Sequence, residues 1–142
     1  MNYTLFMAIF ALMIVSAVTS QSDNNTRNRI DELRIQNLSG QLINYSNALN
    51  DLYANGTPAD GDATTRLVLP QWLARNPDIR ATIQGGAGFV YMPTSPGLFT
   101  QVELETEKSA HFGISDGSGM NTTAGRVNLP AFIPPGYVVY AR

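Results

Sequence analysis

The feature that most constrains the fold is a regular apolar stripe in the first half of this 142-residue chain. Between residues 35 and 52, large apolar side chains recur at steps of three, four, three, four and three residues. This spacing places them on one face of an α-helix, at the a and d positions of a heptad. The stripe consists of Ile35, Leu38, Leu42, Tyr45, Leu49 and Leu52. We therefore predict an amphipathic helix over residues 23–55.

The sequence does not determine what packs against this apolar face. The face can pack on the chain's own domain, or it can pair with a second copy in a coiled coil. A sustained coiled coil usually needs three or four heptads, and Asn28 and Asp31 occupy the preceding positions of this stripe, where apolar side chains are needed. This favours packing within the domain. The six stripe residues are also a candidate interaction face for a partner, together with an edge strand expected at residues 137–140.

A charge-free apolar segment precedes the helix. Residues 5–18 read LFMAIFALMIVSAV, and the first charged side chain is that of Asp23. The length fits the apolar core of a signal peptide, and about 20 residues with the polar flanks suffice to cross a bilayer. No basic side chain precedes the run, which favours a retained anchor over a cleaved signal. Residues 1–22 are expected to form a hydrophobic helix that continues into the amphipathic helix.

The remainder of the chain predicts a small α+β domain. Residues 56–66 (GTPADGDATTR) have the composition of a linker. Residues 67–142 are expected to form a small, mainly antiparallel sheet with one or two short helices. Two of its features lie close to this linker, a short strand at residues 67–69 and a helical turn that opens at Pro70.

Local turn and cap signals place the other elements of this domain. Short β-like runs flank the glycines of residues 85–88 (GGAG), which predicts a hairpin. Ser95 followed by Pro96 predicts a helix start, with Ser95 as the N-cap. Residues 133–136 (IPPG) place proline and glycine at the centre of a type II turn, and a strand is expected directly after it.

Composition excludes several functional classes. The chain has no cysteine and one histidine, its net charge is −2, and 14% of its residues are charged, against about 25% in an average soluble domain. Disulfides, thiol chemistry and cysteine-based metal sites are therefore excluded. The charge is too small to attract nucleic acid. We expect no nucleic-acid partner, no cofactor and no metal site.

Two clusters of polar residues resemble catalytic sets. His111, Ser115 and Asp116 are crowded on one expected strand and turn, where they cannot form the relay that a nucleophilic serine requires. A second cluster has acidic residues spaced by two on an expected helix, so that they point in different directions. It consists of Glu103, Glu105 and Glu107. We predict no catalytic residues and a protein that is not an enzyme.

Residues 109–142 carry a family resemblance. They read SAHFGISDG, then a glycine-punctuated loop, then NLPAFIPPGYVVY. This stretch is similar to the C-terminal part of the PilM proteins of plasmid-encoded conjugative thin (type IVb) pili, and the apolar run and helix extend the resemblance over most of the chain. The resemblance implies an accessory, non-enzymatic envelope protein that is required to assemble a thin pilus used in conjugation.

The resemblance also implies partners and a location. The partners are pilus-assembly proteins, and the N-terminal segment contacts the membrane. The protein is expected in the bacterial cell envelope, either anchored in the inner membrane with a periplasmic body or exported to the periplasm. Two alternatives remain open, a minor pilin-like subunit of the filament and an unrelated secreted binding protein. A processed pilin normally carries a basic leader, and this chain has no basic residue before its apolar run.

Overall fold

The computed structural model of the protein describes residues 29–142. The anchor or signal segment expected at residues 1–22 lies outside the described residues, so its hydrophobic helix stays a prediction. Between residues 29 and 142, no helix combines the length and the apolarity needed to cross a bilayer. The chain divides into two units, residues 1–34 and residues 35–142. All packing described below lies within the second unit.

A helix is present where the apolar stripe predicts one. It is described from residue 29 to residue 52, and the short 3-10 helix η1 (Tyr53–Asn55) follows it. We refer to it as the long helix. Of the stripe residues, Leu42, Tyr45 and Leu49 are at most 1% exposed. The other three are partly buried against the same core, namely Ile35, Leu38 and Leu52.

The stripe therefore packs on the chain's own domain. Its central residues are enclosed by the sheet and have no surface to offer to a partner or to a second copy. This burial argues against Tyr45 and Leu49 as contact residues for other proteins, whereas Leu52, which is only partly buried, stays a prediction. The physical reason is that the sheet has an apolar face of its own, and the helix stripe is what covers it.

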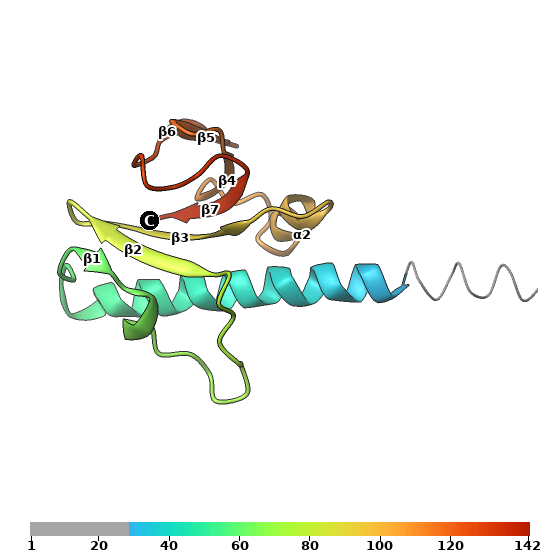
Figure 1. Ribbon diagram of the computed structural model, residues 1–142, viewed down its shortest axis with the longest axis horizontal. Helices are drawn as coiled ribbons and strands as arrows, with labels where there is room; N and C mark the ends of the chain where they lie inside the picture. Colours follow the sequence, from blue (N-terminus) through green and yellow to red (C-terminus); the bar gives the residue numbers. More distant parts are fainter. Residues whose placement is uncertain (1–28) are drawn as a thin grey trace, which may run out of the picture. The chain divides into compact units, whose positions relative to one another are not determined.

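Among the described residues, seven strands form one antiparallel sheet in the order β1-β2-β3-β7-β4-β5-β6 (Figure 1). The strands are β1 (Gly61–Asp62), β2 (Arg80–Gln84), β3 (Ala87–Pro93), β4 (Phe112–Ser115), β5 (Gly119–Thr122), β6 (Gly125–Asn128) and β7 (Tyr137–Ala141). The short helix α2 (Leu98–Glu105) connects β3 to β4, and the 3-10 helix η2 (Thr64–Arg66) follows β1. The predicted α+β class with a mainly antiparallel sheet is confirmed.

Strand β7 lies in the middle of the sheet, which corrects the expectation of an edge strand at residues 137–140. It pairs with β3 on one side and with β4 on the other. Val138 and Val139 point to opposite faces and are both 0% exposed, as an inner strand covered on both sides requires. Turn and strand signals identify this segment, but they carry no information about which strands lie beside it.

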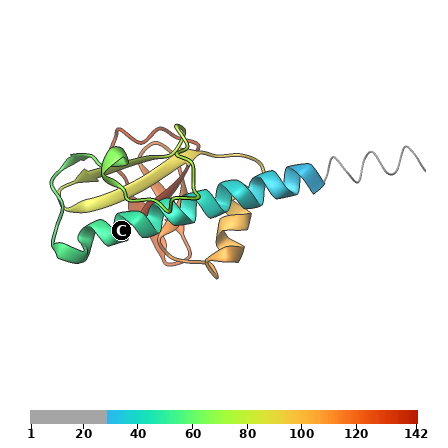
Figure 2. The same ribbon diagram turned by 90° about the horizontal axis from the view of Figure 1, so that it is seen from below.

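Both faces of the central strands are covered. We call the face that packs on the long helix the helix-side face, and the opposite one the outer face. The helix-side core includes Ala81, Ile83, Val90, Met92, Leu98, Val102, Phe112, Val138 and Tyr140. The outer core consists of Phe89, Tyr91, Met120, Leu129, Ile133, Val139 and Ala141. In Figure 2 the part of the long helix within residues 35–52 crosses in front of the strands, whereas β5 and β6 curl over the outer face in Figure 1.

The predicted hairpin and turn are both present. Gly85 and Gly86 connect β2 to β3 with φ angles of 61° and 81°, and two positive φ angles are the requirement of a two-residue type I′ turn. Gly136 has a φ of 78° directly after Pro135, as a type II turn requires. The helix-start prediction is wrong by two residues, because α2 begins at Leu98 and its N-cap residue is Gly97, without a side-chain cap.

Two predictions on polar or short segments are wrong. Residues 67–69 form no strand. Leu67 lies in a loop, and its apolar side chain is buried in the helix-side core. A single turn begins at Pro70, where the Leu73 N–H donates to the Pro70 carbonyl at 3.0 Å. Strand β5 lies in a stretch predicted to be irregular. Its pairing with β4 and β6 decides its conformation, because glycine, asparagine and threonine provide little local preference.

Candidate interaction cleft

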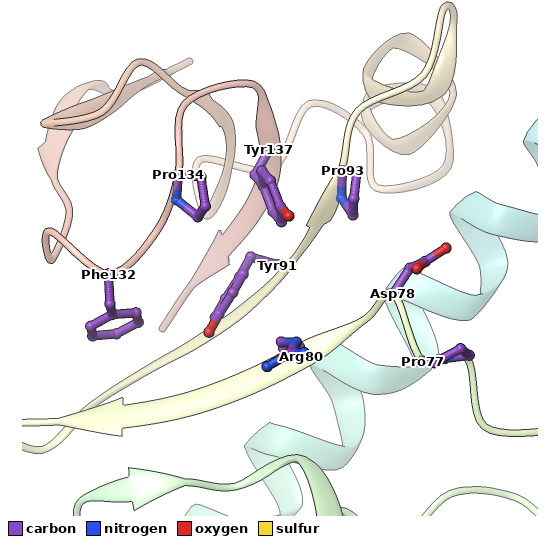
Figure 3. Close-up of a pocket in the computed structure, with 8 residues that line it drawn as sticks. All are labelled: Pro77, Asp78, Arg80, Tyr91, Pro93, Phe132, Pro134 and Tyr137. Carbon is purple, nitrogen blue, oxygen red and sulfur yellow. The ribbon is translucent and has the colours of Figure 1, made fainter.

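A cleft of about 290 Å³ opens on the outer face, where β2, β3 and β7 meet the loop before β7 (Figure 3). Proline and aromatic rings form most of its lining, and two charged side chains complete it. The lining residues are Pro77, Asp78, Arg80, Tyr91, Pro93, Phe132, Pro134 and Tyr137. Sequence reasoning did not find this cleft.

Strand register brings the cleft residues together. Arg80 of β2 lies opposite Tyr91 of β3, and Pro93 of β3 lies opposite Tyr137 of β7. Residues directly opposite each other in an antiparallel pair project from the same face of the sheet. These four side chains therefore share the outer face, although 57 positions separate the first from the last in the sequence. Phe132 completes the wall from the loop between β6 and β7.

Three rings form the wall of the cleft. The centre of the Tyr91 ring lies 6.0 Å from that of Tyr137 and 6.1 Å from that of Phe132, with interplanar angles of 52° and 47°. Tilted and offset arrangements of this kind are the ones that aromatic pairs prefer over face-to-face stacking. Tyr91 is fixed at the base, since it is 7% exposed and its hydroxyl lies 3.1 Å from Thr82 Oγ1. Phe132 is 41% exposed, so its ring remains accessible to a partner.

The two charged groups of the cleft have no hydrogen-bonded partner among the described residues. Arg80 nevertheless lies near the Asp62 carboxylate, whose pKa is lowered by hydrogen bonds from Thr64 and then by the Arg80 charge. Within residues 29–142, no hydrogen bond or ion pair is formed by the Arg80 guanidinium or the Asp78 carboxylate. Both residues are exposed. Figure 3 shows Arg80 beneath Tyr91, and Asp78 at the end of the cleft next to Pro77 and Pro93. The cleft thus presents one cation and one anion beside apolar rings.

Ser115 fixes the turn that forms one wall of the cleft. Its hydroxyl donates to the Pro134 carbonyl and accepts from the Tyr137 N–H at 3.0 Å. Its carbonyl accepts from the Gly136 N–H at 2.9 Å. Ser115 is 4% exposed, and these bonds occupy its polar atoms. The residue considered above as a nucleophile therefore holds Pro134 and Tyr137 in place.

The other members of that polar cluster have separate structural contacts. His111 Nδ1 lies 2.9 Å from the Ala141 carbonyl oxygen. The Asp116 carboxylate pairs with Arg126 at 2.8 Å and accepts the N–H groups of Ser118 and Gly119. The Arg126 guanidinium, followed by these N–H donors, holds the pKa of Asp116 well below its usual range. The described structure therefore does not join His111, Ser115 and Asp116 by hydrogen bonds.

The acidic cluster does not converge either. Glu105 accepts hydrogen bonds from Ser39 Oγ of the long helix at 3.0 Å and from Gln101 Nε2 at 2.9 Å. Glu107 lies beyond the end of α2 with a φ of 54°. Nowhere in residues 29–142 do three acidic, histidine or cysteine side chains gather closely enough to hold a metal ion.

A second exposed apolar surface lies on the loop between η2 and β2. Val68 and Trp72 are 82% and 74% exposed. The loop is held in shape by Arg75, whose guanidinium donates to the carbonyls of Thr64 at 2.9 Å and Leu67 at 2.8 Å. It borders a shallow groove of about 270 Å³ beside the long helix. The same loop continues to Asp78, whose carboxylate has no hydrogen bond or ion pair within residues 29–142.

The fold and the cleft define a small α+β domain. A helix packs on one face of its antiparallel sheet, and a cleft lined by aromatic and proline rings opens on the other face. The family model named PilM matches residues 9–141. The chain belongs to the PilM family, as the resemblance of residues 109–142 predicted, and is therefore a pilus-related protein.

A solved structure has a similar fold. A crystal structure of a PilM protein from Escherichia coli B7A is similar with a TM-score of 0.59 and 24% sequence identity, over 79% of this chain and 94% of that one. A PilM protein from Pseudomonas aeruginosa 2192 has 26% identity over 76% of this chain and 92% of that one, with a TM-score of 0.47. A comparison with curated proteins finds no match.

Proposed function

We propose that this protein is an accessory, non-enzymatic component of the bacterial cell envelope that is required to assemble a thin pilus used in conjugation. Membership of the PilM family over residues 9–141 is the observation that carries the proposal. The apolar run at residues 5–18 supports a place in the inner membrane or export to the periplasm.

The outer-face cleft is the part of the domain that contacts pilus-assembly proteins in this proposal. The helix stripe is occupied by the domain's own sheet, whereas the cleft keeps Phe132 and Arg80 accessible. Aromatic residues and arginine are enriched at the centres of protein interfaces, because they bury a large area and form several contacts at once. The cleft is therefore a more suitable docking site than the helix face proposed from the sequence.

A minor subunit of the filament is the second candidate function. One observation favours it, the packing of a long helix against an antiparallel sheet, which is the general plan of pilin-like subunits. A subunit is recovered with the filament, whereas an assembly factor remains in the cell. Antibody detection of the protein in sheared, purified pili separates the two candidates.

Deletion of the gene with complementation tests the proposed function. We expect the deletion to abolish both liquid mating and thin pili seen by electron microscopy, and the intact gene to restore both. Complementation with a Phe132→Ala and Arg80→Gln double variant should fail although the protein accumulates normally. Arg34→Gln, an exposed change on the long helix, is the matched control and should complement. Normal pili and normal transfer in the deletion strain would overturn the proposal.

A further inference from the structure

Two segments without charged residues lie next to each other in the fold. Residues 35–50 of the long helix and residues 67–74 of the loop between η2 and β2 contain no aspartate, glutamate, lysine, arginine or histidine. Asn76 fastens the end of this loop to the helix. Its backbone N–H donates to the Tyr45 hydroxyl and its side-chain amide donates to Gln41 Oε1, both at 2.8 Å. We call residues 67–74 the apolar loop.

The long helix carries amides on the side next to the apolar loop, where a surface helix usually carries charges. Three of them recur at steps of three residues, which keeps them on one side of the helix, and none is buried. They are Gln41, Asn44 and Asn47, and we call them the amide row. Asn44 and Asn47 line the shallow groove of about 270 Å³ together with Val68 of the loop. The amide row and the apolar loop therefore form one continuous surface.

Charged residues lie at the ends of this surface and balance one another. Arg66 directly precedes the apolar loop, and Asp51 lies one turn beyond Asn47, at the end of the groove. After the loop, the Arg75 guanidinium is bound to loop carbonyls, and Asp78 follows three residues later. Two cations and two anions give no net attraction for a charged ligand. We therefore expect contacts of this surface to be apolar and insensitive to salt.

The two exposed apolar side chains of the loop protrude. Val68 and Trp72 are 82% and 74% exposed, and Figure 1 shows this loop extending past the long helix on the side away from β7. Leu69 and Leu73, by contrast, pack against the helix-side core and hold the loop in place.

Protrusion favours a lipid surface over a protein partner. A specific protein interface buries about 800 Å² on each partner, whereas one aromatic side chain supplies at most about 250 Å². A protein would also need a shaped pocket for each protruding side chain. The head-group region of a bilayer needs no such pocket, and tryptophan is enriched there because its ring is apolar while its N–H is polar.

We infer that the apolar loop lies against a lipid bilayer, with Val68 and Trp72 inserted at the level of the head groups and the amide row facing them. The inference rests on the proposed function in that the apolar run at residues 5–18 holds the chain in the inner membrane. A second contact of a tethered chain needs little affinity of its own, because the tether keeps the loop at a high effective concentration near the bilayer. Two inserted side chains then suffice.

Trp72 is the single tryptophan of the chain, so tryptophan fluorescence reports on the loop alone. The test uses the full-length protein reconstituted into phosphatidylcholine vesicles, with flotation to show that protein and vesicles stay together. Phosphatidylcholine brominated near the head of one acyl chain should reduce the emission of Trp72 about twofold, as expected for a ring inserted at this depth. Acrylamide in the water should quench Trp72 less than in the urea-unfolded protein. Salt, or replacement of part of the lipid by phosphatidylglycerol, should change neither result.

Three variants assign the contact to this surface. Trp72→Phe combined with Phe132→Trp moves the reporter to the outer face, where brominated lipid should not quench it. Asn47→Asp places a carboxylate on the amide row and should lower the quenching of Trp72, because a charge resists the loss of water at the bilayer surface. Asn128→Asp, an exposed change on β6, is the matched control and should leave the quenching unchanged. Circular dichroism should show the same fold for every variant.

Four results would overturn the inference. Emission of Trp72 that brominated lipid does not change while acrylamide quenches it fully would place the loop in water. Protection from acrylamide without quenching by brominated lipid would identify a protein surface, such as that of a second copy, as the cover of the loop. Equal quenching of the reporters at positions 72 and 132 would show unspecific adsorption of the domain. The fourth result is a protein that does not float with the vesicles.

The outcome for the loop is separable from the outcome for pilus assembly. All four results leave the proposed assembly role standing if the deletion strain lacks pili. Quenching of Trp72 by brominated lipid together with normal piliation in the deletion strain would retain the inference and remove the proposed function.

Discussion

The two faces of the central sheet are built from the same strands, but they differ in the kind of side chain they carry and in how far those side chains are exposed. On the helix-side face, Val90 and Val138 meet the aliphatic stripe of the long helix and are 0% exposed. On the outer face, the ring of the alternate residue Tyr91 lies against those of Phe132 and Tyr137, at a cleft that also contains two charged side chains. The helix-side face supplies most of the buried aliphatic packing. The outer face has a smaller core of its own, and its Phe132 ring is partly exposed.

Truncation of the helix-side core should have the largest effect. Leu49→Ala removes a side chain that is 0% exposed, and we expect the free energy of unfolding to fall by about 2–5 kcal/mol. Urea unfolding followed by circular dichroism measures this change. Leu104→Ala on α2 is the control, because Leu104 is 69% exposed and its loss should change stability by no more than about 0.5 kcal/mol. Equal costs for the two variants would contradict packing of the stripe on the sheet.

Substitution of two glycines by alanine should change the stability of the protein in opposite directions. A Cβ at Gly88 would lie 2.8 Å from the Tyr53 hydroxyl and 2.9 Å from Leu49 Cδ2, so Gly88→Ala should destabilise the protein by about 1–3 kcal/mol. Gly40 lies within the long helix with nothing within 4 Å of such a Cβ. Gly40→Ala should therefore raise stability by about 0.5–1 kcal/mol. Thermal unfolding of both variants checks the signs, and a stabilising Gly88→Ala would refute the tight contact between helix and hairpin.

Truncation on the outer face should separate stability from function. Phe132 is 41% exposed, so Phe132→Ala should cost only about 1 kcal/mol, less than a buried truncation. We expect complementation of piliation to be lost all the same. The comparison of the urea midpoint with mating frequency tests this, with Leu104→Ala again as the reference. A large loss of stability would show that the rings serve the core and not a partner.

The smallest effect should come from the exposed pair of Asp116 and Arg126, which belongs to neither face. The pKa of Asp116 is lowered in the folded protein, chiefly by Arg126. Below the ordinary aspartate pKa of about 3.9 the unfolded chain binds a proton that the folded chain does not. The contribution to stability is therefore present at neutral pH and is lost as the pH falls through the folded pKa. Asp116→Asn should show a shallower decline of stability between about pH 5 and pH 3, and an identical decline would refute the assignment.

Much of the fold could be predicted because local signals determine it. The steps from Ile35 to Leu52 define a helix face whatever covers it. Paired glycines at positions 85 and 86 permit a turn that other residues disfavour, and Pro135-Gly136 does the same before β7. These elements depend on residues close together in the sequence, so a single chain is enough to identify them.

The candidate site could not be predicted, since no local signal describes it. Arg80 and Tyr91 come together in the hairpin of β2 and β3, but Tyr137 joins them only because β7 pairs with β3, and strand order is a property of the whole chain. Residues 133–136 (IPPG) before β7 were interpreted as a turn, and the exposure of Phe132 depends on how the loop before that turn lies on the outer face. The same limitation misplaced residues 137–140 at an edge and left β5 unrecognised.

The central place of β7 has a consequence for the order in which the protein is made. β7 is the last of the described strands to be synthesised, yet β3 and β4 both depend on it for a neighbour. Until residue 141 has left the ribosome, the strands before and after α2 are two separate groups, each with uncovered apolar side chains. Distant pairings of this kind form late and slowly. The sheet can therefore close only after β7 has been translated, and a nascent chain that stops before residue 137 leaves one side of β3 and one side of β4 without a partner strand.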